Sequence, residues 1–213
     1  MKLRRYEQLS AELSRMTCSD LVEIGTWNAR RAQELANAAL RRNPAVTYQG
    51  FDLFELLTAE ELEAELSKQP PSKAEVEATL SGFAQAVAGR GRVVSSRRRT
   101  FAFALHMGYT RETLPEFRSQ HPDFRAQFIF IDGGHKIETI ENDWTHCSEF
   151  LDRSGALFLD DYYGDLELAR SFGCNELIAR LRDEPQWNVS ILPVVDKTAI
   201  GDVQIAKVVR ATS

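Results

Sequence analysis

The chain has 213 residues and a mass of 24.1 kDa, so we expect one domain over residues 1–213 with a single core. Its net charge of -5 argues against nucleic acid and anionic membranes as partners, because both are polyanions. The three cysteines form no CxxC pair, and no apolar run approaches the roughly 18 residues of a membrane span, which argues against a zinc cage, a disulfide framework and a transmembrane protein. The opening residues contain no hydrophobic signal region, so we expect a cytoplasmic protein.

Hydrophobic periodicity predicts helices and strands that alternate along the chain. In chain order we expect a helix over Tyr6–Met16, a strand over Leu21–Gly25, a helix over Ala29–Arg41, a strand over Val46–Asp52, helices over Ala59–Ser67 and Lys73–Ala88, and a strand over Phe101–Met107. The order continues with a helix over Glu112–Gln120, a strand over Gln127–Asp132, a helix over Lys136–Leu151, a strand over Ala156–Asp161, a helix over Cys174–Arg182, and strands over Val189–Val195 and Val203–Val209. The loop between the last two strands is too short for a helical crossover, so this pair should be antiparallel. The pattern predicts an α/β fold with a mostly parallel sheet and helices on both faces.

Residues 54–73 do not fit a simple strand–helix–strand unit. Thr58–Glu61 and Ser72–Glu75 both have the capping-box pattern, so each predicts the start of a helix. Gly89-Arg-Gly91 is expected to end the second of these helices. The first helix is interpreted as an insertion that either roofs a ligand site or fills space at the surface.

Four predicted strands end on a glycine or on acidic residues, which are Gly25, Asp52, Asp132 and the pair Asp160–Asp161. In an open parallel sheet, ligands bind in the crevice outside the carboxyl ends of the strands. These residues should therefore gather at one edge of one sheet. The pattern favours an enzyme and indicates where its site lies.

The turn after the first strand reads Glu23-Ile-Gly25-Thr26-Trp27-Asn-Ala29. A small residue there lets the backbone approach a ligand, and the following helix offers free N–H groups. Dinucleotide binding requires G-x-G-x-x-G, but Trp27 stands in the place of the second glycine. The turn therefore suits a smaller ligand that is uncharged or zwitterionic rather than a pyrophosphate.

Two further strand ends are candidates for nucleoside binding. Asp52 could accept hydrogen bonds from both hydroxyls of a ribose, or it could cap the turn that follows it. Tyr109 and Thr110 follow Gly108 after the third strand, where they could flank an adenine or form an ordinary turn with a helix-capping threonine.

The acids at the ends of two later strands form the strongest pattern. Asp132 begins Asp132-Gly-Gly-His135, and Asp160-Asp161 ends the next strand. Three neighbouring carboxylates repel one another, and a hard divalent cation such as Mg²⁺ relieves that repulsion. The alternative is that the acids separately cap turns. For His135 three roles stay open, which are general base, neighbour of a metal and loop histidine.

Five segments, VEIGTWNARRA, the FD of YQGFD, GYTRETLP, FIDGGHKIETIENDW and GALFLDDYY, resemble the class I S-adenosylmethionine-dependent methyltransferases. The branch they resemble is that of the magnesium-dependent O-methyltransferases of small molecules, including the sugar and macrolide-tailoring type. The resemblance extends from about Leu21 to Tyr163. It implies a Rossmann-like, doubly wound, seven-stranded sheet in the order 3-2-1-4-5-7-6, with the last strand antiparallel.

The resemblance also implies roles for individual residues. The cofactor S-adenosylmethionine would contact Glu23, Gly25, Thr26, Trp27, Asp52, Tyr109, Thr110 and Asp132, a Mg²⁺ or similar ion would bind Asp132, Asp160 and Asp161, and His135 or Asp132 would act as the base. Ala29 departs from the pattern, since a glycine is usual there. The insertion at residues 54–73 and the run Arg97–Arg99 match no family pattern, so we expect them either to border the acceptor pocket or to lie on a solvated surface.

The expected function is metal-assisted O-methyl transfer to a hydroxyl of a small molecule such as a sugar, polyol or natural product. Two alternatives stay open. A nicotinamide-dependent oxidoreductase is disfavoured by the missing G-x-G-x-x-G, and a non-catalytic nucleotide-binding module is disfavoured by three mutually repelling acids. The expected partner is a small hydroxylated acceptor rather than nucleic acid or a membrane, and a homo-oligomer is left open.

Overall fold

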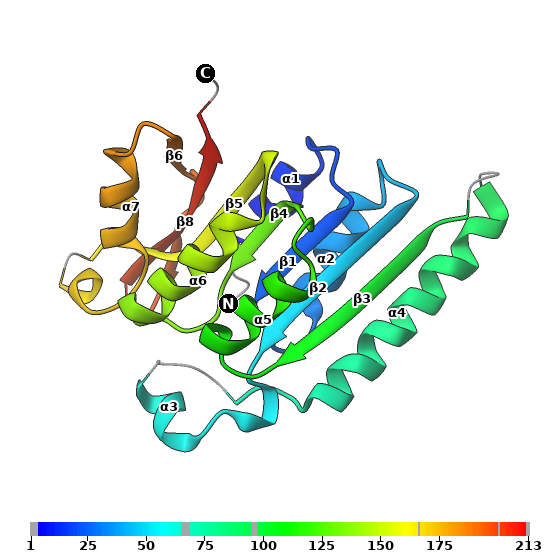
Figure 1. Cartoon of the computed structure of the whole chain (residues 1–213), viewed down its shortest axis with the longest axis horizontal. Coiled ribbons are helices and arrows are strands. Elements are labelled where there is room, and N and C mark those ends of the chain that lie inside the picture. Colours follow the sequence, from blue (N-terminus) through cyan, green and yellow to red (C-terminus); the bar gives the residue numbers. More distant parts are fainter. Residues whose placement is uncertain (1–3, 65–68, 95–97, 166, 200, 212–213) are drawn as a thin grey trace.

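The computed structural model describes residues 4–64, 69–94, 98–165, 167–199 and 201–211. One twisted sheet runs through the molecule, with helices packed on both of its faces (Figure 1). This arrangement is the doubly wound α/β fold that the alternation of strands and helices predicts.

The strands are β1 Asp20–Ile24, β2 Ala45–Asp52, β3 Thr100–Met107, β4 Ala126–Ile131, β5 Leu151–Tyr163, β6 Trp187–Ile191, β7 Asp196–Thr198 and β8 Gly201–Arg210. Along the main path their order is β3-β2-β1-β4-β5-β8-β6, and β7 pairs with β8 outside this path. β8 runs antiparallel to both β5 and β6, whereas β1 to β5 are mutually parallel. The predicted order and the antiparallel last strand are confirmed, and β7 is an additional strand.

The helices are α1 Glu7–Leu13, α2 Arg30–Ala39, α3 Ala59–Ala64, α4 Lys73–Val94, α5 Thr110–Gln120, α6 Ile137–Glu149 and α7 Asn175–Arg182, with short 3-10 helices at Phe54–Leu56 and Leu168–Arg170. α3 and α4 start at the two predicted capping boxes. In each box the glutamate accepts hydrogen bonds from the backbone and hydroxyl of the Thr58 or Ser72 cap.

Alternation along the central strands divides the interior into two apolar cores. Phe128 and Phe130 of β4 pack on the face covered by α1, α2 and α4, whereas Ile129 and Ile131 pack on the face covered by α5, α6 and α7. Successive strand side chains point to opposite faces, so a strand that is covered on both sides must be apolar throughout. The continuous apolar runs in the sequence therefore correspond to the strands at the centre of the sheet.

α4 and β5 extend furthest beyond their predicted bounds. α4 continues through Gly89 and Gly91 to Val94, although this glycine pair was expected to end it. A glycine costs a helix only about 1 kcal/mol, and Val76, Leu80 and Val87 anchor α4 to the sheet core. β5 is longer than the predicted Ala156–Asp161 at both ends, because Leu151 pairs with Ala126 of β4 at its start and Tyr162 and Tyr163 pair with β8 at its end. Among the described residues, no helix is long and apolar enough to cross a membrane.

We expect the core on the α2 face to contribute strongly to stability. Leu35 is fully buried, so Leu35→Ala should lower the free energy of unfolding by about 2–5 kcal/mol through the cavity that it creates. Leu56 is 48% exposed, and Leu56→Ala should change that energy by no more than about 0.5 kcal/mol. Urea denaturation followed by circular dichroism measures both, and equal losses would contradict this assignment of the core.

Candidate active site

The carboxyl ends of β1 and β4 approach each other closely at Gly25. The Gly25 amide donates to the Phe51 carbonyl at 2.9 Å, and the Asp132 amide donates to the Ile24 carbonyl at 2.8 Å. Gly25 has a φ of +87°, and a Cβ at this position would overlap the Asp132 carbonyl oxygen. Only glycine fits both requirements, so this residue joins the two strand ends that carry the predicted cofactor and metal residues.

The turn that follows Gly25 keeps a left-handed backbone without further glycines. Trp27 has a φ of 44° and Ala29 a φ of 59°, which for residues other than glycine costs on the order of 1 kcal/mol each. Ala29 thus tolerates the position where the family pattern has glycine. Trp27 is 45% exposed, whereas the buried Thr26 hydroxyl lies 3.2 Å from the Tyr48 hydroxyl, to which it can donate a hydrogen bond. Thr26 therefore turns its side chain into the core and can offer a ligand only its backbone.

Asp52 lies beside this turn and organises it. One carboxylate oxygen accepts from the Trp27 amide at 2.7 Å, and the other accepts from the Phe54 amide at 2.9 Å. Burial raises the pKa of Asp52, while these backbone hydrogen bonds oppose the rise. The turn-capping alternative is thus present in the structure. It also fixes the direction of the carboxylate, whose remaining lone pairs can still accept from a ligand hydroxyl.

Glu23 and Arg31 leave two buried polar atoms without a partner among the described residues. Glu23 Oε2 accepts from the Tyr48 hydroxyl at 2.5 Å, but Glu23 Oε1 and Arg31 Nε are buried without hydrogen bonds. Burial raises the pKa of Glu23 to about 8. An unpartnered buried acceptor and donor are costly, and a ligand that carries both an ammonium and a carboxylate would satisfy them.

Tyr109 and Thr110 lie at the carboxyl end of β3, where α5 begins. The Tyr109 hydroxyl donates to Glu61 of α3 at 2.5 Å, and the Arg111 guanidinium lies 4.0 Å from the centre of the Tyr109 ring. The Thr110 hydroxyl accepts from Asn142 of α6 at 3.2 Å. Both residues are therefore held on the same edge of the sheet as Gly25 and Asp52.

Asp132, Asp160 and Asp161 form one acid cluster in the structure, in which a carboxylate oxygen of each lies within 4.8 Å of the others. Asp132 follows β4 directly, and the other two acids lie near the end of the neighbouring β5. The predicted convergence of the three acids at one edge of the sheet is thus present.

A distortion of β5 allows two consecutive residues to join the same cluster. In a regular strand, Asp160 and Asp161 would point to opposite faces of the sheet. The pairing of β5 with β8 is irregular between Leu159 and Tyr162, and Asp161 adopts a left-handed φ of 58°. Such an irregularity redirects a side chain, which explains how both carboxylates reach Asp132.

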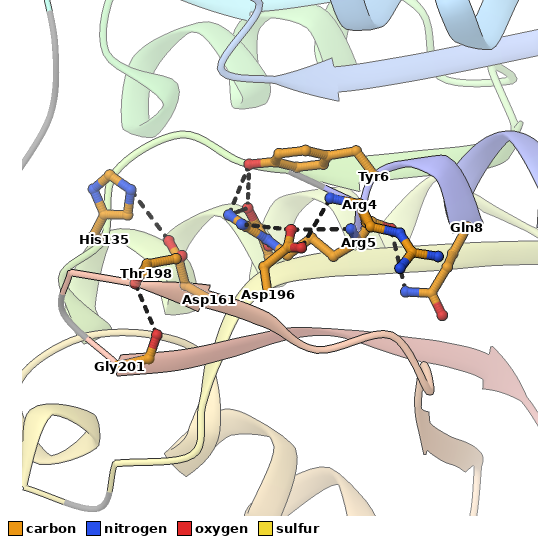
Figure 2. A network of polar contacts seen from close by, with 10 residues as sticks. Arg4, Arg5, Tyr6, Gln8, His135, Asp161, Asp196, Thr198 and Gly201 are labelled. Atoms are coloured by element: carbon orange, nitrogen blue, oxygen red, sulfur yellow. Dashed lines mark hydrogen bonds and ion pairs between the residues drawn. The ribbon is translucent and has the colours of Figure 1, made fainter. Parts of the chain in front are cut away.

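A segment without any predicted role in the site, at Gly173 and Cys174, holds this distortion in place. The Gly173 amide donates to the His135 carbonyl at 2.7 Å, and the Cys174 amide donates to the Asp161 carbonyl at 3.0 Å. A Cβ on Gly173, whose φ is +83°, would overlap the Asp161 carbonyl oxygen. His135 in turn places its Nε2 3.2 Å from an Asp161 carboxylate oxygen, as Figure 2 shows. A glycine outside any predicted element thus positions both of these site residues.

A second group of residues missed by the sequence analysis comes from the start of the chain. Arg5 is 5% exposed and donates from Nε and one terminal nitrogen to the two oxygens of Asp160, both at 2.7 Å. The Tyr6 hydroxyl donates to the same carboxylate at 2.6 Å. Figure 2 shows Arg5 and Tyr6 on one side of Asp161 and His135 on the other. No spacing rule links residues 155 positions apart, so their sequence carries no signal of this contact.

The three acids have different protonation tendencies. Burial and the charges of its two neighbours raise the pKa of Asp132 well above its ordinary range. Burial also acts on Asp160, but the hydrogen bonds and charge of Arg5 outweigh it and hold the pKa of Asp160 below its ordinary value. Burial and Asp160 raise the pKa of Asp161 to about 6, with His135 opposing. Holding all three groups ionised is therefore unfavourable, and protons or a bound cation would relieve this cost.

The inserted segment at residues 54–73 touches two of the predicted cofactor residues. The Trp27 indole donates to the Gln69 carbonyl at 3.3 Å, and Glu61 accepts from Tyr109. Figure 1 places α3 beyond the carboxyl ends of β2 and β3. α3 has no buried residue, so these contacts rather than core packing hold it there.

Arg98 and Arg99 of the arginine run do not border this site. Arg98 and Arg99 are exposed and precede β3 at Thr100, which pairs with Ala45 at the amino end of β2. The cofactor turn and the acid cluster lie at the opposite, carboxyl edge of the sheet. Of the two alternatives for this run, the acceptor-pocket border is therefore wrong for Arg98 and Arg99, which lie on the exposed surface, and Arg97 lies outside the described residues.

Comparison with known proteins identifies the family. A family model described as a methyltransferase domain matches residues 22–162, which is more than half of the chain. No curated protein matches the sequence.

Solved structures share the fold at low identity. The O-methyltransferase TomG from Streptomyces achromogenes, solved in complex with S-adenosylmethionine and involved in tomaymycin synthesis, matches with a TM-score of 0.66 at 11% identity, over 100% of this chain and 82% of TomG. The Bacillus cereus O-methyltransferase, solved with S-adenosylhomocysteine, matches with a TM-score of 0.59 at 13% identity, over 98% and 82% of the two chains. The calicheamicin methyltransferase CalS11 matches with a TM-score of 0.61 at 14% identity, over 94% and 76%. At such identities the likeness concerns the fold.

We expect Gly25 to be irreplaceable. Gly25→Ala should lower the free energy of unfolding by more than about 2 kcal/mol, because the methyl group overlaps backbone and the residue needs a left-handed φ. The matched control is Gly82→Ala in α4, where a Cβ meets nothing within 4 Å and should be neutral or stabilising by about 0.5–1 kcal/mol. Chemical denaturation compares them, and a Gly25→Ala protein as stable as the control would refute the close approach.

Proposed function

We propose that this chain, which belongs to the methyltransferase-domain family and is a class I S-adenosylmethionine-dependent methyltransferase, methylates a hydroxyl oxygen of a small molecule with the help of a divalent ion. In the overall reaction the methyl–sulfur bond breaks as a methyl–oxygen bond forms, and the hydroxyl loses its proton. The products are a methyl ether and S-adenosylhomocysteine. The observation that carries the proposal is the acid cluster, which lies directly beside the Gly25 turn.

The residues at the Gly25 turn fit the methyl donor. Its methionine end carries an ammonium and a carboxylate, which match the unpartnered Glu23 Oε1 and Arg31 Nε in charge. Asp52 already points along the turn and has lone pairs left for ribose hydroxyls. Tyr109 and Thr110 would flank the adenine side, as their place beside the same edge of the sheet suggests.

The acid cluster fits a hard divalent ion such as Mg²⁺. Its oxygens lie within 4.8 Å of one another, and carboxylate oxygens are the ligands that Mg²⁺ prefers. The pKa values of Asp132 and Asp161 are both raised, as expected for acids whose charge lacks a compensating cation. When bound, the ion would orient the acceptor and lower the pKa of its hydroxyl.

The contacts favour His135 over Asp132 as the group that takes the acceptor's proton. Burial and the neighbouring charges of Asp160 and Asp161 raise the pKa of Asp132 well above its ordinary value, and a carboxylate that also serves as a metal ligand is a poor base. His135 lies beside the cluster rather than within it, and Asp161 at 3.2 Å would stabilise its charged form once the proton has arrived. The remaining contribution is alignment of the acceptor oxygen with the methyl group.

The insertion at residues 54–73 is proposed to roof the cofactor side of the site, through the contacts of Glu61 with Tyr109 and of Gln69 with Trp27. Such a cover would keep water from the sulfonium. We further propose a cytoplasmic location, which fits three buried free thiols at Cys18, Cys147 and Cys174.

Replacing the proposed ribose acid should weaken cofactor binding. We expect Asp52→Ala to reduce the affinity for S-adenosylhomocysteine by about 1–3 kcal/mol, because charge-assisted hydrogen bonds to ribose are lost and the turn at Trp27 loses its cap. Isothermal titration calorimetry measures the effect, and Asp183→Ala at an exposed position serves as the control. Unchanged affinity in Asp52→Ala would reject this role.

Removing divalent ions should stop turnover without removing the cofactor. We expect EDTA to slow the release of S-adenosylhomocysteine at least about 100-fold with a panel of small hydroxylated acceptors, and added Mg²⁺ to restore it. Asp161→Asn should reproduce the loss, since it removes one acid of the cluster. Cofactor affinity, measured in parallel, should stay near its original value. Activity that persists after exhaustive chelation would show that the acids serve another purpose.

A further inference from the structure

Arg5 contributes a buried positive charge to the acid cluster. The residue is 5% exposed, and its guanidinium makes two hydrogen bonds of 2.7 Å to Asp160. A terminal nitrogen also donates to the Tyr6 hydroxyl at 2.9 Å, and the other lies 3.4 Å from Asp196. Each nitrogen of the guanidinium thus has a protein partner, and burial keeps the side chain from serving as a substrate contact.

The contact uses both oxygens of Asp160. The guanidinium binds them as a fork, and the Tyr6 hydroxyl adds a third hydrogen bond at 2.6 Å. Paired arginine–carboxylate bonds of this kind are strong and geometrically specific. Arg5 makes no such fork with Asp132 or Asp161. Asp160 therefore has fewer free lone pairs for a metal ion than Asp132 and Asp161 have.

Hydrogen bonds hold the backbone on either side of the Arg5 side chain, so the guanidinium has a fixed position relative to Asp160. The amides of Arg4 and Arg5 donate to the two oxygens of Asp196 at 2.9 and 3.0 Å. Asp196 begins β7, the strand that the sequence analysis did not predict, and it is 4% exposed. Leu9 and Leu13 of α1 are buried in the sheet core, which fixes the other end of the segment.

We propose that the Arg5 guanidinium is a built-in cation of the acid cluster that competes with a divalent ion for Asp160, so that the ion would rest mainly on Asp132 and Asp161. The proposal rests on the divalent-ion site of the proposed function and refines it. Arg5 then acts as a positioning residue, which sets the affinity of the site without contacting the acceptor.

If Arg5 competes with the ion, replacing it should raise the affinity of the cluster for a divalent ion, whereas the loss of a purely structural residue should lower that affinity. Loss of a residue that merely holds Asp160 in place would weaken ion binding. Loss of a competing positive charge a few ångströms away should strengthen it, because like charges repel strongly where solvent screening is poor.

The test is a Mn²⁺ titration of the full-length protein, followed by the electron paramagnetic resonance signal of free Mn²⁺. We expect Arg5→Gln to bind Mn²⁺ at least about tenfold more tightly than the original protein, as removal of a nearby unit charge predicts. Arg5→Lys keeps the charge and should stay close to the original affinity. Arg4→Gln makes the same charge change at the exposed neighbour and should have little effect.

Thermal unfolding checks that each variant is folded. If Arg5→Gln does not fold, Arg5→Met removes the same charge from an unbranched side chain without altering the three acids, and it should also tighten Mn²⁺ binding. Equal or weaker Mn²⁺ binding in the folded variant would overturn the proposal.

The test separates this inference from the proposed function. If the original protein binds Mn²⁺ and the variant binds no better, only the role of Arg5 fails. If the original protein does not bind Mn²⁺ but Arg5→Gln does, Arg5 is confirmed as the resident cation and the metal-assisted function fails. If neither binds, both fail, and methyl transfer is then judged by S-adenosylhomocysteine release alone.

Discussion

Three carboxylates share one small volume at the carboxyl ends of β4 and β5, and much of the surrounding structure compensates their charge. Burial makes such a group unfavourable unless cations or protons balance it. Arg5 balances Asp160 with a two-pronged hydrogen bond, and His135 lies against Asp161. This need for compensation is consistent with the position of Arg4 and Arg5, whose amides bind Asp196 at the start of β7.

Backbone geometry delivers the acids to that place. Because Gly25 has no side chain, the end of β1 can approach the Asp132 backbone at the end of β4. The distortion at Asp161 turns the carboxylates of two consecutive residues toward Asp132. Gly173 locks the distortion from outside the sheet through contacts with both His135 and Asp161. The cofactor turn and the acid cluster are therefore neighbours for one reason, which is the tight packing around the end of β4.

Much of the fold could be predicted because strands covered on both faces need continuous apolar runs, as in Phe128–Ile131. The convergence of the acids could be predicted because the carboxyl ends of parallel strands lie at one edge of the sheet. Contacts between segments that are far apart in the sequence could not be predicted. Nothing near Arg5 indicates Asp160, and Gly89 resembled a helix end although packing carries α4 past it. The sequence could not show whether Arg98 and Arg99 lie at the amino or the carboxyl edge of the sheet, because a run of charges carries no information about the position of its loop.

The most direct test of the central claim is anomalous X-ray diffraction from crystals of the protein grown with S-adenosylhomocysteine and Mn²⁺. We expect one anomalous peak about 2–2.5 Å from carboxylate oxygens of Asp132 and Asp161, beside a cofactor whose ribose contacts Asp52. A well-ordered cofactor at the Gly25 turn with no anomalous peak at the acid cluster would contradict the account.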